Sequence, residues 1–527
     1  MSIGTATNEA TLRKSQDVRR PDWLTILFWS AVVALFVTAI AMRLNGLGLP
    51  FDRDGYDEGV YWQSLRAMSA GHALYGDVFY SQPPFFLLST FPFYTLFGDT
   101  LWSARLGIAL VSLLGLIGAF LLGKALSGRL GALAALLLAI TNPLYLAQSQ
   151  TIQAEAASTA FSFLAAGLAF LWFKYPLGRR GMILAILTGV TVALSTLSKL
   201  LGVALLVPIG LLMLVRLWQG TPSEGIEGRE NGSKQRPYAS VLAGVAAFIV
   251  TMAVLLLPFA GAYHAFIAGV ITFHTDAASV LGNTAQYRQA ANTGILKTAL
   301  VSLLALAALY GTGVAILRQD WRVLPLLGWF GASAFLLWRQ VPLFPHHLVS
   351  LVPPFIALAV MGIVQPASLQ AGIPKKTASS IATILTVIAV VLLLFTAGAD
   401  IRQDASYYRT AQARSVDGLA QLEERVAIDL REAIAPGQQV VTDAQFVAGL
   451  AERDTPPSLV DTSMVRIETG YLTLAQLETA ASQPQVHAVL FFSGRFSLPQ
   501  VAAFHAWVSQ HFHLLHDYGA GRQLWVR

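Results

Sequence analysis

The sequence predicts a mainly α-helical protein, in which a polytopic membrane helix bundle is followed by a small C-terminal α/β domain. Of the 527 residues, 55% are hydrophobic and only 12% are charged, and the mean hydropathy is +0.58. A soluble protein has about a quarter of its residues charged. Apolar runs of the length that spans a bilayer, about 20 residues, recur as far as residue 398. From about Asp400 the composition becomes that of a soluble domain.

The apolar runs predict about eleven membrane-spanning helices. The first run, 23–42, follows the basic residues Arg13, Lys14, Arg19 and Arg20, as a signal peptide would. It is longer than the typical signal core of about 7–15 residues, so we interpret it as an uncleaved anchor. Two further apolar stretches, 60–70 and 84–97, are too short or too interrupted by proline to span, and are predicted as interfacial helices. The spans are expected at 23–42, 103–123, 130–147, 156–173, 181–197, 200–215, 239–259, 297–316, 323–338, 347–364 and 378–398.

The distribution of lysine and arginine predicts the orientation. Cytoplasmic loops carry an excess of these residues, and an N-terminus inside the cell satisfies this rule at every inner loop. An odd number of spans then places the C-terminal region outside. This orientation requires the chain to reverse near Ser198 and Lys199; the alternative, a single long span over 181–215, would invert the orientation of everything that follows. The inner loops hold Lys124, Arg129, Lys174, Arg179, Arg180, Arg216, Arg229, Lys234, Arg236, Arg318, Arg322, Lys375 and Lys376.

Three regions follow from these patterns: a cytoplasmic tail (1–22), a transmembrane domain (23–399) and an extracytoplasmic domain (400–527). The glycine-rich loop 220–238 is typical of a flexible linker. In the C-terminal region, 438–442 and 486–492 are predicted as buried strands, and 426–434, 474–481 and 499–511 as helices. Alternating strands and helices favour a small α/β domain.

Composition also excludes several kinds of site. There is no cysteine, which excludes disulfides, thiolate zinc sites and cysteine nucleophiles. The net charge of +6 is scattered and does not indicate nucleic-acid binding. Neither a phosphate-binding P-loop nor a dinucleotide fingerprint is present, so use of a nucleotide is not expected.

The acidic stretch after the first span is the strongest candidate for a site. Four carboxylates, those of Asp52, Asp54, Asp57 and Glu58, fall within seven residues. A carboxylate near hydrocarbon is costly unless it faces water or a polar partner. The cluster therefore indicates either a polar site at the bilayer surface or an ordinary solvated loop.

The residues that follow resemble a known family. The Asp57-Glu58 pair precedes an aromatic-rich run that ends in Arg66-Ala-Met68, and then comes the proline pair Pro83-Pro84. Further matches are Ser103-Ala-Arg105-Leu, the polar segment 148–155 and the His-His-to-Pro-Pro segment 346–354. In order and position these motifs are similar to those of the GT-C glycosyltransferases that use polyprenyl-phosphate sugars, which include protein O-mannosyltransferases and the aminoarabinose transferase of lipid A. The resemblance covers about residues 20–400.

The resemblance implies an inverting transfer of a sugar from a lipid-phosphate donor to an acceptor hydroxyl on the outer face of the membrane. The hydroxyl needs a general base within hydrogen-bond reach, which the family pattern assigns to Asp57, with Glu58 orienting the backbone or an arginine. Asp52 and Asp54 could serve as the general base in place of Asp57, but we expect them to have only a structural role in the loop. The phosphate leaving group needs cationic or donor stabilisation. The expected substrate- and phosphate-binding residues are Arg66, Arg105, Gln82, Glu155, Lys199, His346 and His347.

Each of these residues also has a structural interpretation. Arg66 could simply pair with Glu58 or Asp54, and Lys199 could extend to the interface without a function. Glu155 lies at the mouth of a span, where a charge is a functional hypothesis by default; it could support the acceptor or hold a metal. Because adjacent side chains point in different directions, we expect at most one of His346 and His347 to face a given ligand.

Two departures from the family pattern concern the subfamily. The aminoarabinose transferase has a lysine before its proline pair, where this chain has Gln82, which can only form hydrogen bonds. The O-mannosyltransferases have large extra domains between helices, which this chain lacks. The expected partners are a polyprenyl-phosphate sugar, a protein, lipid or glycan acceptor, and membrane lipids. No cofactor is assigned, and a divalent metal is left open.

Two other classes of function remain as alternatives. A transporter or flippase of lipid-linked sugars would use the acids as a substrate or proton relay, but it is expected to place ionisable groups near the bilayer midplane. A non-catalytic membrane scaffold would leave the acidic loop without an explanation.

Overall fold

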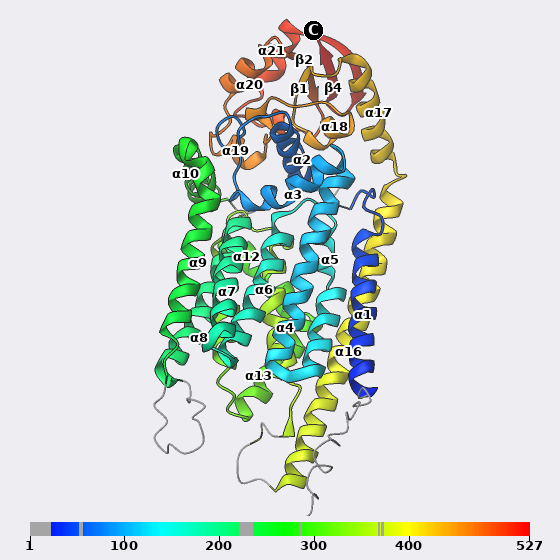
Figure 1. Ribbon diagram of the computed structural model, residues 1–527. Coiled ribbons are helices and arrows are strands. Elements are labelled where there is room, and N and C mark those ends of the chain that lie inside the picture. The colour runs from blue at the N-terminus through cyan, green and yellow to red at the C-terminus, as the bar shows by residue number, and fades with distance from the viewer. Residues whose placement is uncertain (1–22, 52–55, 221–234, 285–286, 367–368, 370–373) are drawn as a thin grey trace, which may run out of the picture.

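The computed structural model describes residues 23–51, 56–220, 235–284, 287–366, 369 and 374–527. Within them, a bundle of long helices carries the C-terminal domain at one end (Figure 1). The predicted tail 1–22, the candidate acids Asp52 and Asp54, and most of the predicted linker lie outside the described residues.

Seven helical segments of the described chain are long and apolar enough to cross a membrane, or eight if α12 (Gln289–Leu300) and α13 (Leu303–Leu317) form one bent span. Large apolar side chains such as Val37 and Val391 are exposed on the outside of these helices. Bilayer hydrocarbon is the solvent that suits such a surface, and the chain is an integral multi-pass membrane protein. The predicted count of eleven spans stays a prediction. The seven segments are α1 (Trp23–Leu44), α4 (Leu101–Thr141), α6 (Ala154–Lys174), α7 (Gly178–Ser198), η1 with α8 (Leu200–Gln219), α9 to α11 (Tyr238–Leu281) and α16 (Lys375–Arg414).

Helix α4 consists of two helices that fold back on one another. The backbone leaves helical geometry at Ser127 and Gly128, and Gly128 has a φ of 71°. A Cβ on Gly123 would lie 2.2 Å from the carbonyl oxygen of Gly131. In a straight helix these two glycines would stand about 12 Å apart. The chain therefore reverses here, in agreement with the separate spans predicted at 103–123 and 130–147.

A second reversal separates α7 from η1 and α8. Lys199 is extended between them, with φ −155° and ψ 139°. A Cβ on Gly202 would lie 2.5 Å from the Ser195 hydroxyl oxygen, so the chain turns back on α7. The reversal predicted near Ser198 and Lys199 is therefore present, and it leaves Lys199 at the tip of the turn.

The first loop forms two helices between the bundle and the C-terminal domain. Helix α2 (Tyr56–Ser69) packs against α18 (Gln445–Leu450) of the C-terminal domain, and α3 (Phe85–Leu96) packs against α4. A Cβ on Gly59 would lie 2.5 Å from the backbone nitrogen of Phe446, so only glycine allows α2 to approach this closely. Helix α2 was expected on the membrane surface, but nine of its fourteen residues are buried, because the C-terminal domain covers it.

The rest of the bundle includes shorter elements, some of which lie at its end near the C-terminal domain, while others run from that end toward the opposite one. Among them, η4 enters α15 directly and carries the histidine pair to the top of the bundle. These elements are α5 (Pro143–Ser149), α14 (Val323–Arg339), η4 (Pro345–Leu351) and α15 (Val352–Val360).

The C-terminal domain is built on a four-stranded mixed sheet in the order β1-β2-β4-β3. Strands β1 (Gln439–Thr442) and β2 (Val486–Phe491) are parallel, as expected for strands joined through helices. Strands β3 (His513–Gly519) and β4 (Arg522–Val526) form an antiparallel hairpin at the edge. The predicted strands and the α/β class agree with this sheet, whereas the hairpin was not predicted.

Both faces of the sheet are covered by helices, because successive side chains of a strand point to opposite faces. Val441, Val489 and Trp525 face one core, and Val440, Leu490 and Leu524 face the other. The helices α20 (Leu474–Ala481) and α21 (Ala503–His511) cover the first face, and α17 (Gly418–Ala433) and α18 cover the second. A short helix, α19 (Met464–Glu468), follows β1 and α18. The domain boundary expected at residue 400 falls inside α16, which continues as one helix to Arg414.

Candidate active site

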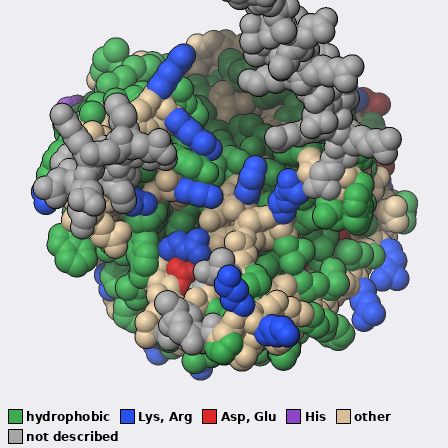
Figure 2. Space-filling view, turned by 60° about the horizontal axis from the view of Figure 1, so that its bottom comes forward, with side chains coloured by type: hydrophobic (Ala, Val, Ile, Leu, Met, Phe, Trp, Pro, Cys, Tyr) green, Lys and Arg blue, Asp and Glu red, His purple; other side chains and the backbone are tan. Residues whose placement is uncertain are grey.

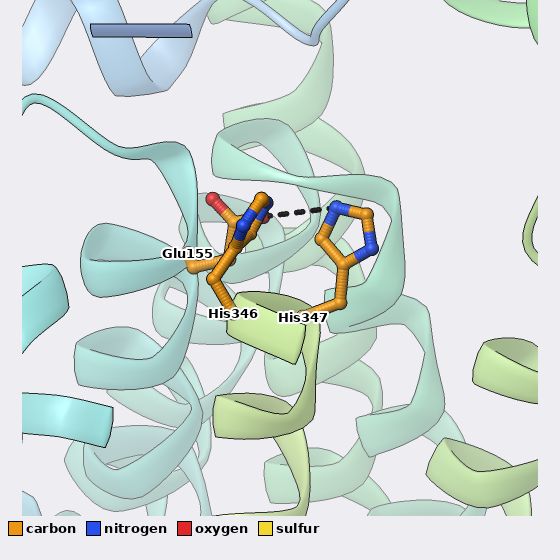
Figure 3. A group of neighbouring side chains, drawn as sticks. All are labelled: Glu155, His346 and His347. Atoms are coloured by element: carbon orange, nitrogen blue, oxygen red, sulfur yellow. Dashed lines mark ion pairs between the residues drawn. The ribbon is translucent and has the colours of Figure 1, made fainter. Parts of the chain in front are cut away.

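Ionisable side chains from four distant segments meet where the helix bundle joins the C-terminal domain. Glu155 lies in the first turn of α6, and His346 and His347 lie in η4. Figure 3 shows both imidazole rings turned toward the Glu155 carboxylate. Lys199, at the tip of the second reversal, and Asp57, in the first turn of α2, complete the group. We call these five residues the acidic–histidine cluster.

Glu155 is the centre of the cluster, and its side chain is only 2% exposed. One of its oxygens, Oε1, accepts a hydrogen bond from the Lys199 ammonium. The same oxygen lies 3.5 Å from His346 Nε2 and 3.4 Å from His347 Nε2. The second oxygen, Oε2, is buried with no hydrogen-bond partner among the described residues. A buried polar atom without a partner costs free energy, so this oxygen is a candidate to bind a ligand.

The two histidines converge on one point, contrary to the expectation that only one would face a given ligand. Their rings meet edge to face, with centroids 4.4 Å apart and planes at 78°. His347 Nδ1 accepts a hydrogen bond from the Phe344 N–H at 3.2 Å, which puts the ring proton on Nε2. That N–H then points at Glu155. The tight turn of η4 and the perpendicular rings are what bring both Nε2 atoms to the same carboxylate.

Asp57 borders the cluster on the side of the C-terminal domain. Its Oδ2 lies 3.9 Å from His346 Nε2, and its side chain is 42% exposed, so a substrate can reach it. Partial withdrawal from water at this junction raises the pKa of the Asp57 carboxyl, and the charge of His346 opposes that rise. Asp57 is therefore an accessible carboxylate with a raised proton affinity, as a general base requires.

Glu58 and Arg105 form a separate ion pair beneath the cluster. Arg105 Nε and Nη2 donate to the two Glu58 oxygens at 2.7 and 2.6 Å, and both side chains are fully buried. Arg105 Nη1 also donates to the backbone carbonyls of Leu47 and Leu49. The Ile152 N–H donates to Glu58 at 3.0 Å. With its donors occupied and no exposed surface, Arg105 has no room for a phosphate, so the structure gives it and Glu58 a structural position that fixes the start of α2.

Replacing Arg105 with methionine is expected to destabilise the folded protein by about 3–5 kcal/mol, because the Glu58 carboxylate would stay buried without its partner. The matched control is Arg66→Met, since Arg66 pairs with the 37% exposed Asp454 and should contribute less than about 1 kcal/mol. Thermal unfolding of both variants in the same detergent, followed by tryptophan fluorescence, makes the comparison. Equal losses of stability in the two variants would contradict a dominant role for the buried Glu58–Arg105 pair.

Arg66 lies in the interface between α2 and the C-terminal domain. Its Nε donates to Asp454 at 2.7 Å, so it secures that interface instead of reaching the cluster. Gln63, on the same helix, donates to the Arg453 carbonyl at 3.1 Å and accepts from the Thr455 N–H at 3.2 Å. The expected phosphate contact of Arg66 is replaced by a partner 388 residues away in the sequence.

An apolar cavity of about 500 Å³ opens beside the cluster. Lys199, Gln82 and Arg339 supply polar groups to its wall, and leucine, valine and isoleucine side chains form much of the rest. A cavity of this kind suits a lipid that carries a phosphate. Sequence reasoning did not single out His274, which also lines the cavity and contacts the Ser81 carbonyl through Nε2 at 2.8 Å. Its local sequence, an isolated histidine in an apolar run, gave no signal.

Glu155, His346 and His347 also fit the donor set of a divalent metal. One ligand atom from each lies within 4.8 Å of the others. The separations of 3.4 and 3.5 Å from Glu155 Oε1 are close to the about 3.3 Å between ligands of a tetrahedral zinc site. Lys199 donates to that same oxygen, so a metal would have to displace its ammonium.

Comparisons with known proteins agree with this architecture. Residues 69–274 match the family model of dolichyl-phosphate-mannose-protein mannosyltransferases. No curated protein matches the chain. The structure of ArnT from Cupriavidus metallidurans in the apo state is similar with a TM-score of 0.58 and 15% identity, covering 95% of this chain and 97% of that one. The structure of the same transferase bound to undecaprenyl phosphate has a TM-score of 0.56 and 14% identity, covering 96% and 98%. The likeness extends over nearly the whole of both chains, so they share a fold.

Proposed function

We propose that this chain belongs to the GT-C superfamily of glycosyltransferases and transfers a sugar from a polyprenyl-phosphate donor to an acceptor hydroxyl on the membrane face that carries the C-terminal domain. The observation that carries the proposal is the acidic–histidine cluster, which places an accessible carboxylate and a lysine beside an apolar cavity. The family match to residues 69–274 and the shared fold support the same class of reaction.

The donor lipid would lie in the apolar cavity, with its phosphate at the polar wall. Lys199 is a point charge held there by Glu155, and Arg339 adds a second cation. Both charges would stabilise the phosphate as the bond between it and the anomeric carbon breaks. Gln82, where the aminoarabinose transferase has a lysine, would contribute a hydrogen bond only.

The acceptor hydroxyl would approach Asp57 from the exposed side of the cluster. Its proton would pass to a carboxylate oxygen of Asp57 while the hydroxyl oxygen forms the new bond to the anomeric carbon. The polyprenyl phosphate would leave from the opposite face of that carbon, which gives inversion. Asp461 of the C-terminal domain lies close enough to raise the pKa of Asp57, so this domain helps to shape the site.

The donor class is tested by incubating the purified full-length protein with a panel of polyprenyl-phosphate hexoses and pentoses, each with and without a mixture of protein, lipid and glycan acceptors. Consumption of one donor with release of polyprenyl phosphate is expected. If no donor is consumed but labelled lipid-linked sugar crosses reconstituted vesicles, the protein is a transporter instead. Repeating the assay after EDTA treatment shows whether the Glu155 and histidine group must hold a metal.

The pH dependence of transfer should report Asp57. Only the ionised carboxylate can accept a proton, so the rate should fall as the pH falls through the raised pKa of Asp57, at a higher pH than for a solvated aspartate. In His346→Gln the opposing charge is removed, and this acid limb of kcat/KM should move to still higher pH. His72→Gln, which changes a histidine beside Asp77, is the control and should leave the limb in place. If the acid limb of the kcat/KM profile did not move in His346→Gln, the charge interaction between His346 and Asp57 would be contradicted.

The face that carries the C-terminal domain is expected to be extracytoplasmic, as the lysine and arginine distribution predicts. A reporter that is active only outside the cytoplasm, fused after Arg527, should be active. The same reporter inserted in the loop after α8 should be silent. The reverse pattern would invert the orientation of the candidate active site.

A further inference from the structure

A second cavity, which is polar and has a volume of about 380 Å³, lies at the opposite end of the bundle from the acidic–histidine cluster. It is formed where α4 reverses at Ser127 and Gly128 and where α6 ends at Lys174. Helix α6 begins at the cluster, near Glu155, and about 19 residues of helix separate the two, or about 28 Å. This cavity therefore belongs to the other membrane face and plays no part in the proposed transfer.

The cavity is strongly basic. Its wall includes the five cations Lys124, Lys174, Arg216, Arg318 and Arg322. Among the described residues, Asp320 is the carboxylate that pairs with these cations; it accepts from Arg322 at 2.6 and 2.8 Å and from Arg318 at 3.4 Å. One carboxylate cannot balance five cations, so the cavity has an excess of positive charge. Figure 2 shows lysine and arginine side chains gathered on this face, with little acid visible between them.

Two of these arginines are held in place instead of being free in water. Arg216 stacks on the Phe173 ring, 3.8 Å from its centroid, and donates to the Phe173 carbonyl. Its Nε is shut away from solvent and has no hydrogen-bond partner among the described residues. Arg318 is buried and donates to the Met361 carbonyl at 3.1 Å. Buried guanidinium groups are costly unless an anion or a set of acceptors compensates them.

The general excess of basic residues on a cytoplasmic face does not account for this arrangement. Residues that only satisfy that rule are expected to be solvated, as Arg179 and Arg180 are at the start of α7. The arginines of the cavity are instead partly or wholly buried around its wall. Phe170, Phe173 and Ile363 give that space apolar walls beside its cations.

We propose that this cavity binds the phosphate-bearing headgroup of an anionic lipid. The cations would hold the phosphate through charge-assisted hydrogen bonds, and the apolar walls would contact the start of the acyl chains. Basic pockets between transmembrane helices recognise anionic headgroups in this way. The position at a membrane face favours a lipid over inorganic phosphate, which shares the same chemistry.

The test measures binding of phosphatidylglycerol to the full-length protein in detergent by native mass spectrometry, with phosphatidylcholine as the neutral lipid. Wild type is expected to bind phosphatidylglycerol, and Lys124→Gln/Arg216→Gln should weaken binding about tenfold or more. The matched control Arg179→Gln/Arg180→Gln removes two charges from the same face and should change binding less than about twofold.

Three results would overturn the proposal. They are equal loss in both double variants, equal binding of phosphatidylcholine, and displacement of the lipid by millimolar inorganic phosphate, which would make the free anion the ligand. Thermal unfolding of each variant separates lost binding from lost folding. If the double variant unfolds, Arg216→Lys replaces it. It keeps the charge but lacks the planar guanidinium that can form two parallel hydrogen bonds to a phosphate, and unchanged binding in that variant would also contradict the proposal.

Discussion

Asp57→Asn is expected to lower the rate of sugar transfer by about 10²- to 10⁴-fold, the range that general-base catalysis contributes. Asparagine has nearly the shape of aspartate but cannot take the proton of the acceptor hydroxyl. Because Lys199 and Glu155 are unchanged, donor binding should be retained. The initial rate of polyprenyl-phosphate release at saturating donor gives the catalytic loss, and binding of the donor lipid is measured separately.

The control for this experiment is Asp454→Asn. It removes a carboxylate from the same junction of α2 and the C-terminal domain, where Asp454 pairs with Arg66 and not with the cluster. It should transfer sugar at close to the wild-type rate. Turnover retained by Asp57→Asn would remove Asp57 as the base. An equal loss in both variants would show that the junction, and not the carboxylate, limits the reaction.

The fold was predictable wherever one physical signal dominates the sequence. Runs of apolar residues with bilayer length predicted α1, α6 and α7 almost to their ends, because burial in hydrocarbon requires such runs. The strands β1 and β2 are largely buried and are short segments rich in valine and other apolar residues. The β3–β4 hairpin was missed because β3 is largely exposed and carries histidine and aspartate among its apolar residues. Its turn, Gly519-Ala520-Gly521, has a positive φ at all three residues; the two glycines indicate a turn, but the exposed β3 does not show the alternation that would have completed a hairpin.

The cluster was predictable in its members but not in its pairings. Asp57, Glu155, His346 and His347 were expected from the resemblance, and Lys199 from its position between two apolar runs; the structure brings all five together. Arg66 and Arg105 were expected at a phosphate, yet each is bound to a carboxylate. A sequence can indicate that a cationic side chain lies near a site, but it does not show which carboxylate pairs with that side chain. For Arg66 that acid lies on another domain, and for Arg105 it is the neighbour of the proposed base.

A large loss of donor affinity is expected when Lys199 is replaced. At this residue, binding of the donor phosphate can be separated from neutralisation of the Glu155 carboxylate. Lys199→Met should weaken donor binding about 30-fold or more, the loss of a charge-assisted contact of about 2 kcal/mol or more. It would also leave Glu155 buried without its ammonium partner, which alone could disturb the site. The variant Glu155→Gln/Lys199→Met removes both charges, so no buried carboxylate is left without a partner. Donor affinity and thermal unfolding are measured for both variants and for Glu155→Gln.

If Lys199 holds the donor phosphate, the double variant should regain thermal stability but bind the donor as weakly as Lys199→Met. Glu155→Gln keeps the ammonium at the wall of the cavity, so its donor affinity should fall less than that of Lys199→Met. A double variant that recovers both stability and affinity would give Lys199 a purely structural role as the counter-ion of Glu155. The phosphate would then have to be held by Arg339, the other cation in the wall of that cavity.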